Sequence, residues 1–245
     1  MNIDILTLFP EMFTPLYTSM LGRAADKGIL DIKVTDIRDY TKDKHNRTDD
    51  YPFGGGVGMV MMPDPVFSAL EAVEAQKKKI VYMSPKGQVL NQEKIEELSK
   101  VDDLVILCGH YEGVDQRILE EWDIEEVSIG DYILTGGEPA AIVLVDSVAR
   151  LIPGVLSHEE SAMEESIYSG LLECPHYTQP RDYRGLKVPE VLLSGNHRLI
   201  HLWRFEQALI LTKERRPDMF EEFVKNATDL AKDEKRVMEK VIEMV

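Results

Sequence analysis

The chain has little cysteine and no long hydrophobic run. Its two cysteines, Cys108 and Cys174, form no Cys-x-x-Cys pair, which excludes a disulfide scaffold and a cysteine-based zinc site and is typical of a reduced compartment. The longest purely apolar stretch, residues 140–145, ends at Asp146 and is far too short to span a bilayer. No basic segment precedes an apolar run at the N-terminus, so we expect a cytoplasmic protein that has no signal peptide and does not bind a membrane.

Positive charge is also scarce. Lysine and arginine total 28 residues against 44 aspartates and glutamates, so the formal net charge is −16. This balance excludes a protein that coats nucleic acid through net positive charge. Because charges are screened beyond about 8–10 Å at physiological salt, a local basic patch can still bind a polyanion. The distribution of charge along the chain therefore matters more than its sum.

Short apolar strands alternate with helical segments through the first 150 residues or so. The patterns predict strands at residues 3–9, 30–34, 80–83, 104–108 and 126–129. They predict helices at residues 11–27, 63–76, 91–99 and 139–152, with a short helix after Gly113. This alternation indicates an α/β fold with a mainly parallel sheet covered on both faces. Residues 38–58 form a loop that is too long to be a simple connection.

The second part of the chain has a different pattern. Residues 157–168 are polar and acidic without an apolar period, and helical spacing returns at residues 199–212 and again from Pro217. We therefore expect no further strand. The predicted organisation is an α/β domain at residues 1–156, a linker at 157–169 and a small, mostly helical domain at 170–245.

Three successive predicted strands end in loops that contain glycine, at residues 84–87, 109–113 and 128–139. Ligands of open α/β sheets bind beyond the carboxyl ends of the strands, so we expect the three loops to meet at one site. A single such loop is as readily an ordinary turn, but three together favour a site. None matches a dinucleotide or Walker pattern. Backbone recognition of an adenine with a short amino-acid tail stays open.

These loops, together with residues 7–13, 49–59 and 170–180, resemble the bacterial tRNA (guanine-N1)-methyltransferase family of the SPOUT superfamily. The resemblance covers nearly the whole chain, with the motifs in order. It implies a trefoil-knotted α/β domain and a homodimer whose active sites lie at the subunit interface. It further implies S-adenosyl-L-methionine as methyl donor and N1 of the guanine just 3′ of the anticodon in tRNA as target, a modification that maintains the reading frame.

By this resemblance the three loops build the donor pocket. The expected pocket residues are Ser84, Pro85, Gly87, Gly109, Tyr111, Glu112, Gly113, Ser128, Ile129, Gly130, Tyr132, Leu134, Gly136 and Gly137. Glu112 also matches a residue linked to Mg²⁺ in the family, although the sequence itself shows no metal cage. His110 stands where relatives commonly have arginine, and we expect it at the periphery of the pocket because histidine is a weaker cation at neutral pH.

Methylation of guanine N1 requires removal of its proton and stabilisation of the charge left on O6. The resemblance assigns the base to Glu165, where many relatives have aspartate, and neighbouring Glu164 competes for the role. On composition alone both belong to a solvated acidic linker. Arg150 matches the arginine that would hold O6, whereas without the resemblance it is a cation at a helix C-terminus.

Basic and aromatic residues interleave between residues 171 and 217, which suits a single-stranded anticodon loop. The alternative is that Trp203 packs inward and the arginines are simply solvated. The residues expected to contact tRNA are Arg181, Arg184, His197, Arg198, Arg215 and Arg216. Asp50, with the glycines at 54–58, is expected to shape the target-base pocket or to belong to a loop that closes over it.

Two other functions remain open from the sequence. One is a related knotted methyltransferase that acts on another RNA position, which residues 170–180 argue against. The other is an RNA-binding protein that uses the adenosyl pocket only as a sensor. Arg150 together with an acid at Glu165 disfavours the sensor.

Overall fold

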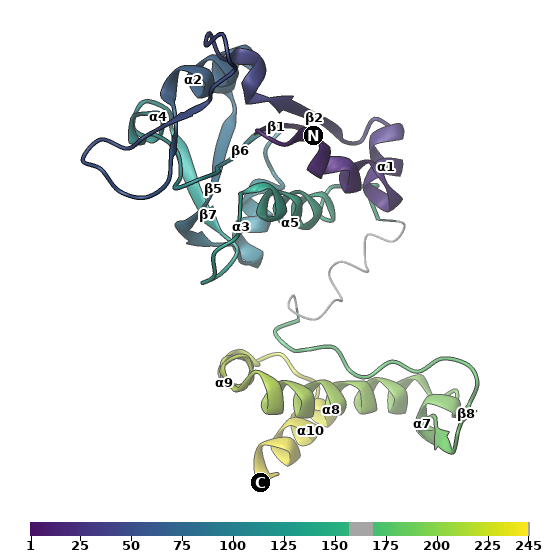
Figure 1. The fold of residues 1–245 in the computed structure, drawn as a ribbon. Coiled ribbons are helices and arrows are strands. Elements are labelled where there is room, and N and C mark those ends of the chain that lie inside the picture. Colours follow the sequence, from purple (N-terminus) through teal and green to yellow (C-terminus); the bar gives the residue numbers. More distant parts are fainter. Residues whose placement is uncertain (157–168, 245) are drawn as a thin grey trace. The chain divides into compact units, whose positions relative to one another are not determined.

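The computed structural model describes residues 1–156 and 169–244. They divide into two compact units, one within residues 1–159 and the other within residues 160–245 (Figure 1). The predicted linker, residues 157–169, lies almost wholly outside the described residues. Within those two ranges, no helix combines the length and the apolar character needed to cross a membrane.

Five parallel strands form the sheet of the first unit (Figure 1). Their order across the sheet is β2-β1-β6-β5-β7, and every neighbouring pair is parallel. The strands are β1 (Asn2–Thr7), β2 (Asp31–Asp36), β5 (Lys79–Val89), β6 (Asp103–Cys108) and β7 (Ile124–Ser128). The prediction of an α/β fold with a mainly parallel sheet is confirmed. A separate antiparallel pair, β3 (Asp49–Asp50) and β4 (Val60–Met61), lies within the long loop.

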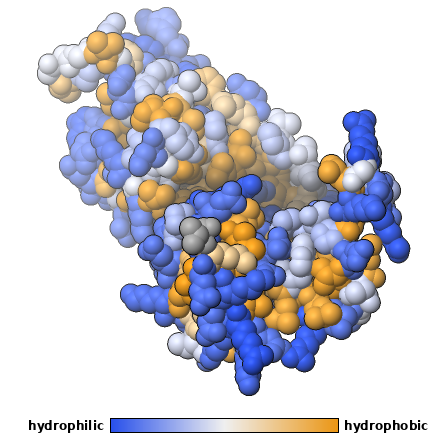
Figure 2. All heavy atoms as spheres, turned by 90° about the horizontal axis from the view of Figure 1, so that it is seen from below, coloured by the Kyte–Doolittle hydropathy of each residue, from blue (hydrophilic) through white to orange (hydrophobic). Residues whose placement is uncertain are grey.

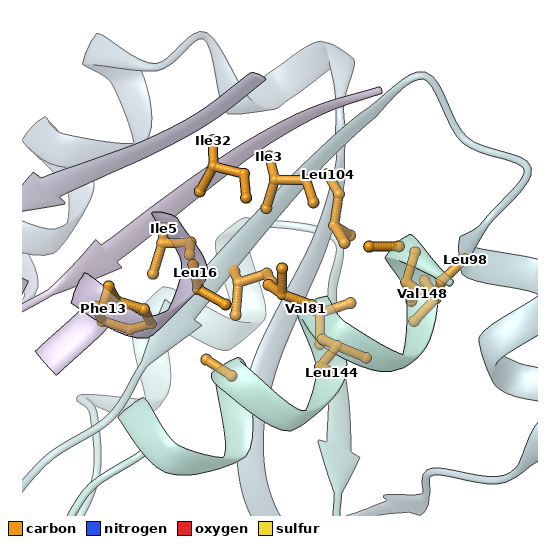
Figure 3. Packing of buried hydrophobic residues seen from close by; sticks show 14 of the residues in the cluster. Ile3, Ile5, Phe13, Leu16, Ile32, Val81, Leu98, Leu104, Leu144 and Val148 are labelled. Atoms are coloured by element: carbon orange, nitrogen blue, oxygen red, sulfur yellow. The ribbon is translucent and has the colours of Figure 1, made fainter. Parts of the chain in front are cut away.

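Helices cover both faces of this sheet, because the buried strands are apolar on both sides. In β6, Leu104 and Ile106 belong to one hydrophobic cluster, whereas Val105 and Leu107 belong to the other. The first cluster, drawn in Figure 3, packs against η1 (Pro10–Tyr17), α1 (Ser19–Asp26), α3 (Gln92–Leu98) and α5 (Glu138–Ala149). The second packs against η2 (Ile37–Tyr40), α2 (Pro63–Ala72), η3 (Ala75–Lys77) and α4 (Gln116–Glu121).

The single helix predicted at residues 11–27 is wrong. The chain instead forms the 3₁₀ helix η1 and then the α-helix α1. Pro15 lies inside η1 and cannot donate a backbone hydrogen bond. Ser19 has a φ of 55°, a left-handed conformation that interrupts a regular helix. The break therefore follows from two local backbone features that apolar spacing does not reveal.

Strand β5 is longer than its apolar pattern predicts. The predicted loop at residues 84–87 lies within it, yet the register with β7 shifts there, because Met83 and Gln88 both lie opposite Val127. The four intervening residues are thus looped out of the ladder. Irregularities of this kind commonly redirect side chains next to functional sites.

The second unit is mostly helical. It contains α7 (Glu190–Leu193), α8 (His197–Arg215), α9 (Pro217–Asn226) and α10 (Lys232–Glu243). Its buried centre is formed by Leu171, Leu209, Phe220 and Val241. The expectation of no further strand is wrong, since β8 (Asp182–Tyr183) and β9 (Leu186–Lys187) form a small hairpin. Its two central residues, Arg184 and Gly185, both have positive φ, as a tight two-residue hairpin turn requires.

Candidate functional site

One cavity of about 280 Å³ lies at the carboxyl ends of β5, β6 and β7. The three glycine-containing loops supply most of its wall, so they meet as the parallel topology predicts. Every expected pocket residue except Gly87 lines it, namely Ser84, Pro85, Gly109, Tyr111, Glu112, Gly113, Ser128, Ile129, Gly130, Tyr132, Leu134, Gly136 and Gly137.

Gly87 has a different position. A Cβ atom added there would lie 2.2 Å from the backbone carbonyl carbon of Glu126 and 2.3 Å from its oxygen. Glycine at this position therefore lets the end of β5 approach β7 closely. The sequence alone does not distinguish this role from that of a pocket residue, because a glycine after an apolar strand gives the same signal in either case.

The loops after β6 and β7 are joined through their backbones. The amide of Gly137 donates to the carbonyl of Gly109 at 2.8 Å, and a bridge pairs His110 with Gly136. A Cβ atom on Gly136 would lie 2.3 Å from Oε2 of Glu138 and 2.6 Å from the His110 ring. Side chains at these glycines would disturb the wall, so the absence of side chains there shapes the cavity.

Part of the lining consists of residues that were not predicted from the sequence. These residues are Tyr82, Met83, Lys86, Val114, Gln116, Leu119, Glu126, Val127, Ile133, Thr135 and Ala140. His110, expected at the periphery, lies in the wall with its ring 4.8 Å from that of Phe9. Burial, and then the nearby Glu126 carboxylate, raise the pKa of Tyr82 to about 12, so its hydroxyl is neutral at physiological pH. Tyr82 and Glu126 are opposite each other in neighbouring strands, a register that the sequence alone does not reveal.

Glu112 lies where the long loop meets the cavity. Its amide donates to the carbonyl of Met59 at 3.0 Å, and a Cβ atom on Gly58 would lie 2.5 Å from its side chain. Asp50 is exposed in β3, and its carboxylate accepts a hydrogen bond from the amide of Tyr51. In the described part of the chain, no group of three or more His, Cys, Asp or Glu residues is arranged to hold a metal ion.

Of the two expected catalytic residues, the structure describes Arg150, which does not line this cavity. Arg150 follows α5 at its C-terminal end, whereas Gly137 precedes the helix. At about 1.5 Å per residue, the two are separated by about 20 Å along the helix axis. Glu165, like its competitor Glu164, lies outside the described residues.

The residues expected to contact tRNA are all exposed on the second unit, where hydrophobic residues come to the surface between hydrophilic ones (Figure 2). Arg198 is paired with Asp233, and Arg216 with Asp218 at 2.6 Å. The Arg184 guanidinium lies 5.2 Å from the centre of the Tyr183 ring. Among the described residues, no ion pair involves the three others, Arg181, His197 and Arg215.

Two residues of the basic and aromatic stretch at 171–217, Lys213 and Trp203, have contacts within the second unit. The Lys213 ammonium donates to the carbonyls of Val241 and Ile242, at 2.8 and 3.1 Å, and so satisfies the C-terminal end of α10. Trp203 is half-buried with its ring 6.3 Å from that of Tyr177. Lys213 therefore has a structural role within the unit.

Glycine loops that meet around a cavity beyond the carboxyl ends of parallel strands define a ligand-binding protein of the open α/β class. The profile described as tRNA (Guanine-1)-methyltransferase TrmD matches residues 1–222. The chain belongs to this family.

Three relatives named tRNA (guanine-N(1)-)-methyltransferase are similar over almost their entire lengths. The Ruminiclostridium cellulolyticum protein is 57% identical over 224 residues, 90% of this chain and 96% of the relative. The Clostridium perfringens protein is 53% identical over 231 residues, 94% of this chain and 98% of the relative. The Bacillus cereus protein is 50% identical over 247 aligned positions, 99% of each chain.

Proposed function

We propose that this chain is a cytoplasmic enzyme that transfers a methyl group from S-adenosyl-L-methionine to N1 of the guanine just 3′ of the anticodon in tRNA. The observation that carries the proposal is the cavity walled by three loops, in a chain whose relatives are named tRNA (guanine-N(1)-)-methyltransferase. The modification would maintain the reading frame during translation.

The cavity suits the donor in shape and in charge. Its walls are largely backbone at Gly109, Gly136 and Gly137, so amide and carbonyl groups are accessible to a planar base. Two carboxylates, Glu112 and Glu126, line it together with one lysine, Lys86. This balance favours a ligand that carries positive charge. When bound, S-adenosyl-L-methionine supplies an electrophilic methyl group.

The chain must also move a proton and stabilise an oxyanion. We assign removal of the N1 proton to Glu165, because a carboxylate can accept it as the methyl group is transferred. We assign stabilisation of the negative charge on O6 to Arg150. Its planar guanidinium is permanently charged and can donate two parallel hydrogen bonds. Asp50 and the loop that follows it would shape the pocket for the target base.

A homodimer with shared active sites is part of this proposal. Its support is the position of Arg150, about 15 Å along α5 from Ala140, which lines its own chain's cavity. On the outer surface of α5, Val143 is 45% exposed, beside the exposed Asp146. A second copy of the chain would cover this surface and could place its own Arg150 near the cavity of the first.

We further propose that the loops at 109–113 and 128–137 belong to a trefoil knot, supported by their backbone hydrogen bond. The domain boundaries follow, with methyl transfer assigned to residues 1–156, a linker at 157–169 and tRNA binding at 170–245. Glu112 would contribute one ligand to a Mg²⁺ ion held otherwise by water and substrate oxygens. No step of the proposed reaction depends on that ion.

The test is transfer of labelled methyl from S-adenosyl-L-methionine to two tRNA transcripts that differ only in carrying guanine or adenine just 3′ of the anticodon. We expect methylation of the guanine transcript alone. Methylation of both would favour a related enzyme with another target position. Donor binding without methylation of either would favour a sensor.

A further inference from the structure

The side chain of Glu126 has an unmatched hydrogen-bonding capacity inside the cavity. Glu126 lies in β7, opposite Tyr82 in β5, and lines the cavity with it. Neither oxygen of this carboxylate accepts a hydrogen bond from the described residues, and one of them, Oε2, is buried in the wall. A largely buried carboxylate without a donor is costly. A ligand that donates a hydrogen bond to this carboxylate from the cavity would therefore gain binding energy.

Glu125, the preceding residue of the strand, carries a carboxylate whose partners stabilise the fold. Glu125 points to the other face of the sheet, where it pairs with Lys79 at 2.8 Å and Lys94 at 2.6 Å. Among the described residues, Glu126 takes part in no ion pair. Two adjacent glutamates thus differ in function, since one holds the fold together and the other faces the cavity.

The negative charge of the Glu126 carboxylate indicates which kind of hydrogen-bond donor a ligand would supply. A carboxylate forms its strongest hydrogen bonds with a cation. The amino group of an adenine is neutral, and backbone carbonyls of the glycine loops suffice for it. An ammonium group is a compact cation with three donors. The hydroxyl of Tyr82, close to Gly109, is neutral, so it does not compete with the carboxylate for a cation.

We propose that the Glu126 carboxylate binds the ammonium group of the donor's amino-acid tail. This inference rests on the proposed function, because it requires a ligand with both a nucleoside and an amino-acid tail. The ammonium group is unchanged by methyl transfer. Glu126 therefore contributes equally to binding of the donor and of its demethylated product, and contributes nothing to a nucleoside that lacks the tail.

Binding of three compounds to the full chain tests this inference by titration calorimetry. They are S-adenosyl-L-methionine, S-adenosyl-L-homocysteine, which lacks the sulfonium charge, and 5′-methylthioadenosine, which lacks the amino-acid tail. Glu126→Gln preserves the shape of the side chain and removes its charge. We expect this variant to bind the first two compounds at least about tenfold more weakly. Its affinity for 5′-methylthioadenosine should be unchanged.

Glu125→Gln is the matched control, since it is the same substitution at the next residue of the same strand. It should lower the unfolding temperature and leave the relative affinities for the three compounds unchanged. Equal weakening of all three by Glu126→Gln would indicate a distorted pocket and overturn the inference. Weakening of S-adenosyl-L-methionine alone would assign Glu126 to the sulfonium and also overturn it, as would no change at all.

The same titration separates this inference from the proposed function. If the unmodified chain binds none of the three compounds, both fail together. If it binds S-adenosyl-L-methionine and Glu126→Gln binds it equally well, only the role of Glu126 fails, and the methyl donor stands.

Discussion

The hydroxyl of Thr7 donates a hydrogen bond of 2.8 Å to Oε1 of Glu138, a residue 131 positions later in the chain. Both side chains are 0% exposed. Thr7 ends β1 and Glu138 begins α5, so this contact fixes the helix that follows the third glycine loop to the central part of the sheet. The other oxygen of Glu138 has no partner among the described residues.

Thr7→Val should therefore destabilise the fold. It keeps the size of the side chain but leaves a buried carboxylate without its side-chain donor, at a cost of about 1–3 kcal/mol in the free energy of unfolding. Urea unfolding measures this change. Thr14→Val is the control, because Thr14 is exposed, and it should have little effect. If Thr7→Val and Glu138→Gln were simply additive in the double variant, the proposed coupling would be refuted.

The Lys94–Glu125 pair should make stability depend on pH at both extremes. Burial acts to raise the pKa of Glu125, but hydrogen bonds from Lys79 and Lys94 outweigh it, so the pKa lies below 4.5. Hydrogen bonds to Glu125 and Glu97 raise the pKa of Lys94 above 10.5. The carboxylate's contribution is therefore complete above pH 4.5 and is lost as the pH falls through its lowered pKa. The lysine's contribution is complete below pH 10.5 and is lost as the pH rises through its raised pKa.

Glu125→Gln should accordingly lower stability by about 2 kcal/mol near neutral pH. The difference between this variant and the unmodified chain should shrink in acid. Thermal unfolding of both proteins, followed between about pH 3 and 8, determines this difference in stability. A difference that stays constant down to the most acidic point would show that the pair contributes nothing through charge.

Arg215→Ala should weaken tRNA binding and reduce the slope of log affinity against log salt by about one, because one phosphate contact is lost. Arg216→Ala should act in the same direction but less strongly, since Arg216 is already paired with Asp218. Filter binding over a range of salt concentrations measures both. Lys27→Ala, an exposed substitution in the first unit, is the control for charge. Equal slopes for Arg215→Ala and Lys27→Ala would locate the RNA face elsewhere.

Glu165→Gln should abolish methyl transfer while donor affinity stays almost intact, because the substitution removes a base and no part of the pocket wall. Single-turnover methyl transfer and donor titration measure the two quantities separately. Glu164→Gln is the matched comparison. Normal turnover in Glu165→Gln combined with loss in Glu164→Gln would transfer the role to Glu164.

Much of the sheet could be predicted because burial and chain geometry act together. Residues 104–108 are apolar throughout, since they face a hydrophobic cluster on each side, and this leaves a clear signal. The hairpin at Asp182–Lys187 left none, because its strands are two residues long and exposed. The break at Ser19 was equally invisible, since it depends on a backbone angle.

The cavity was predictable in outline for a similar reason. Loops after parallel strands must meet at one edge, so glycine in three of them indicated a site without any knowledge of distances. Glu126 was missed because it begins the strand predicted at residues 126–129 and was interpreted only as part of that strand. The sequence already indicated that Arg150 lies near the end of a helix that begins at the third loop, and the structure adds that Arg150 does not line the cavity of its own chain.

Helix α5 sets the distance between Gly137 in the cavity wall and Arg150, the residue proposed to bind O6. Gly137 and Arg150 lie immediately before and after it. Inserting or deleting one residue would rotate Arg150 by about 100° about the axis and shift it by about 1.5 Å. Inserting four would nearly restore the direction yet displace the guanidinium by about 6 Å. Length variation during evolution should therefore be confined to the loops and the C-terminal helices, while this one segment keeps its residue count.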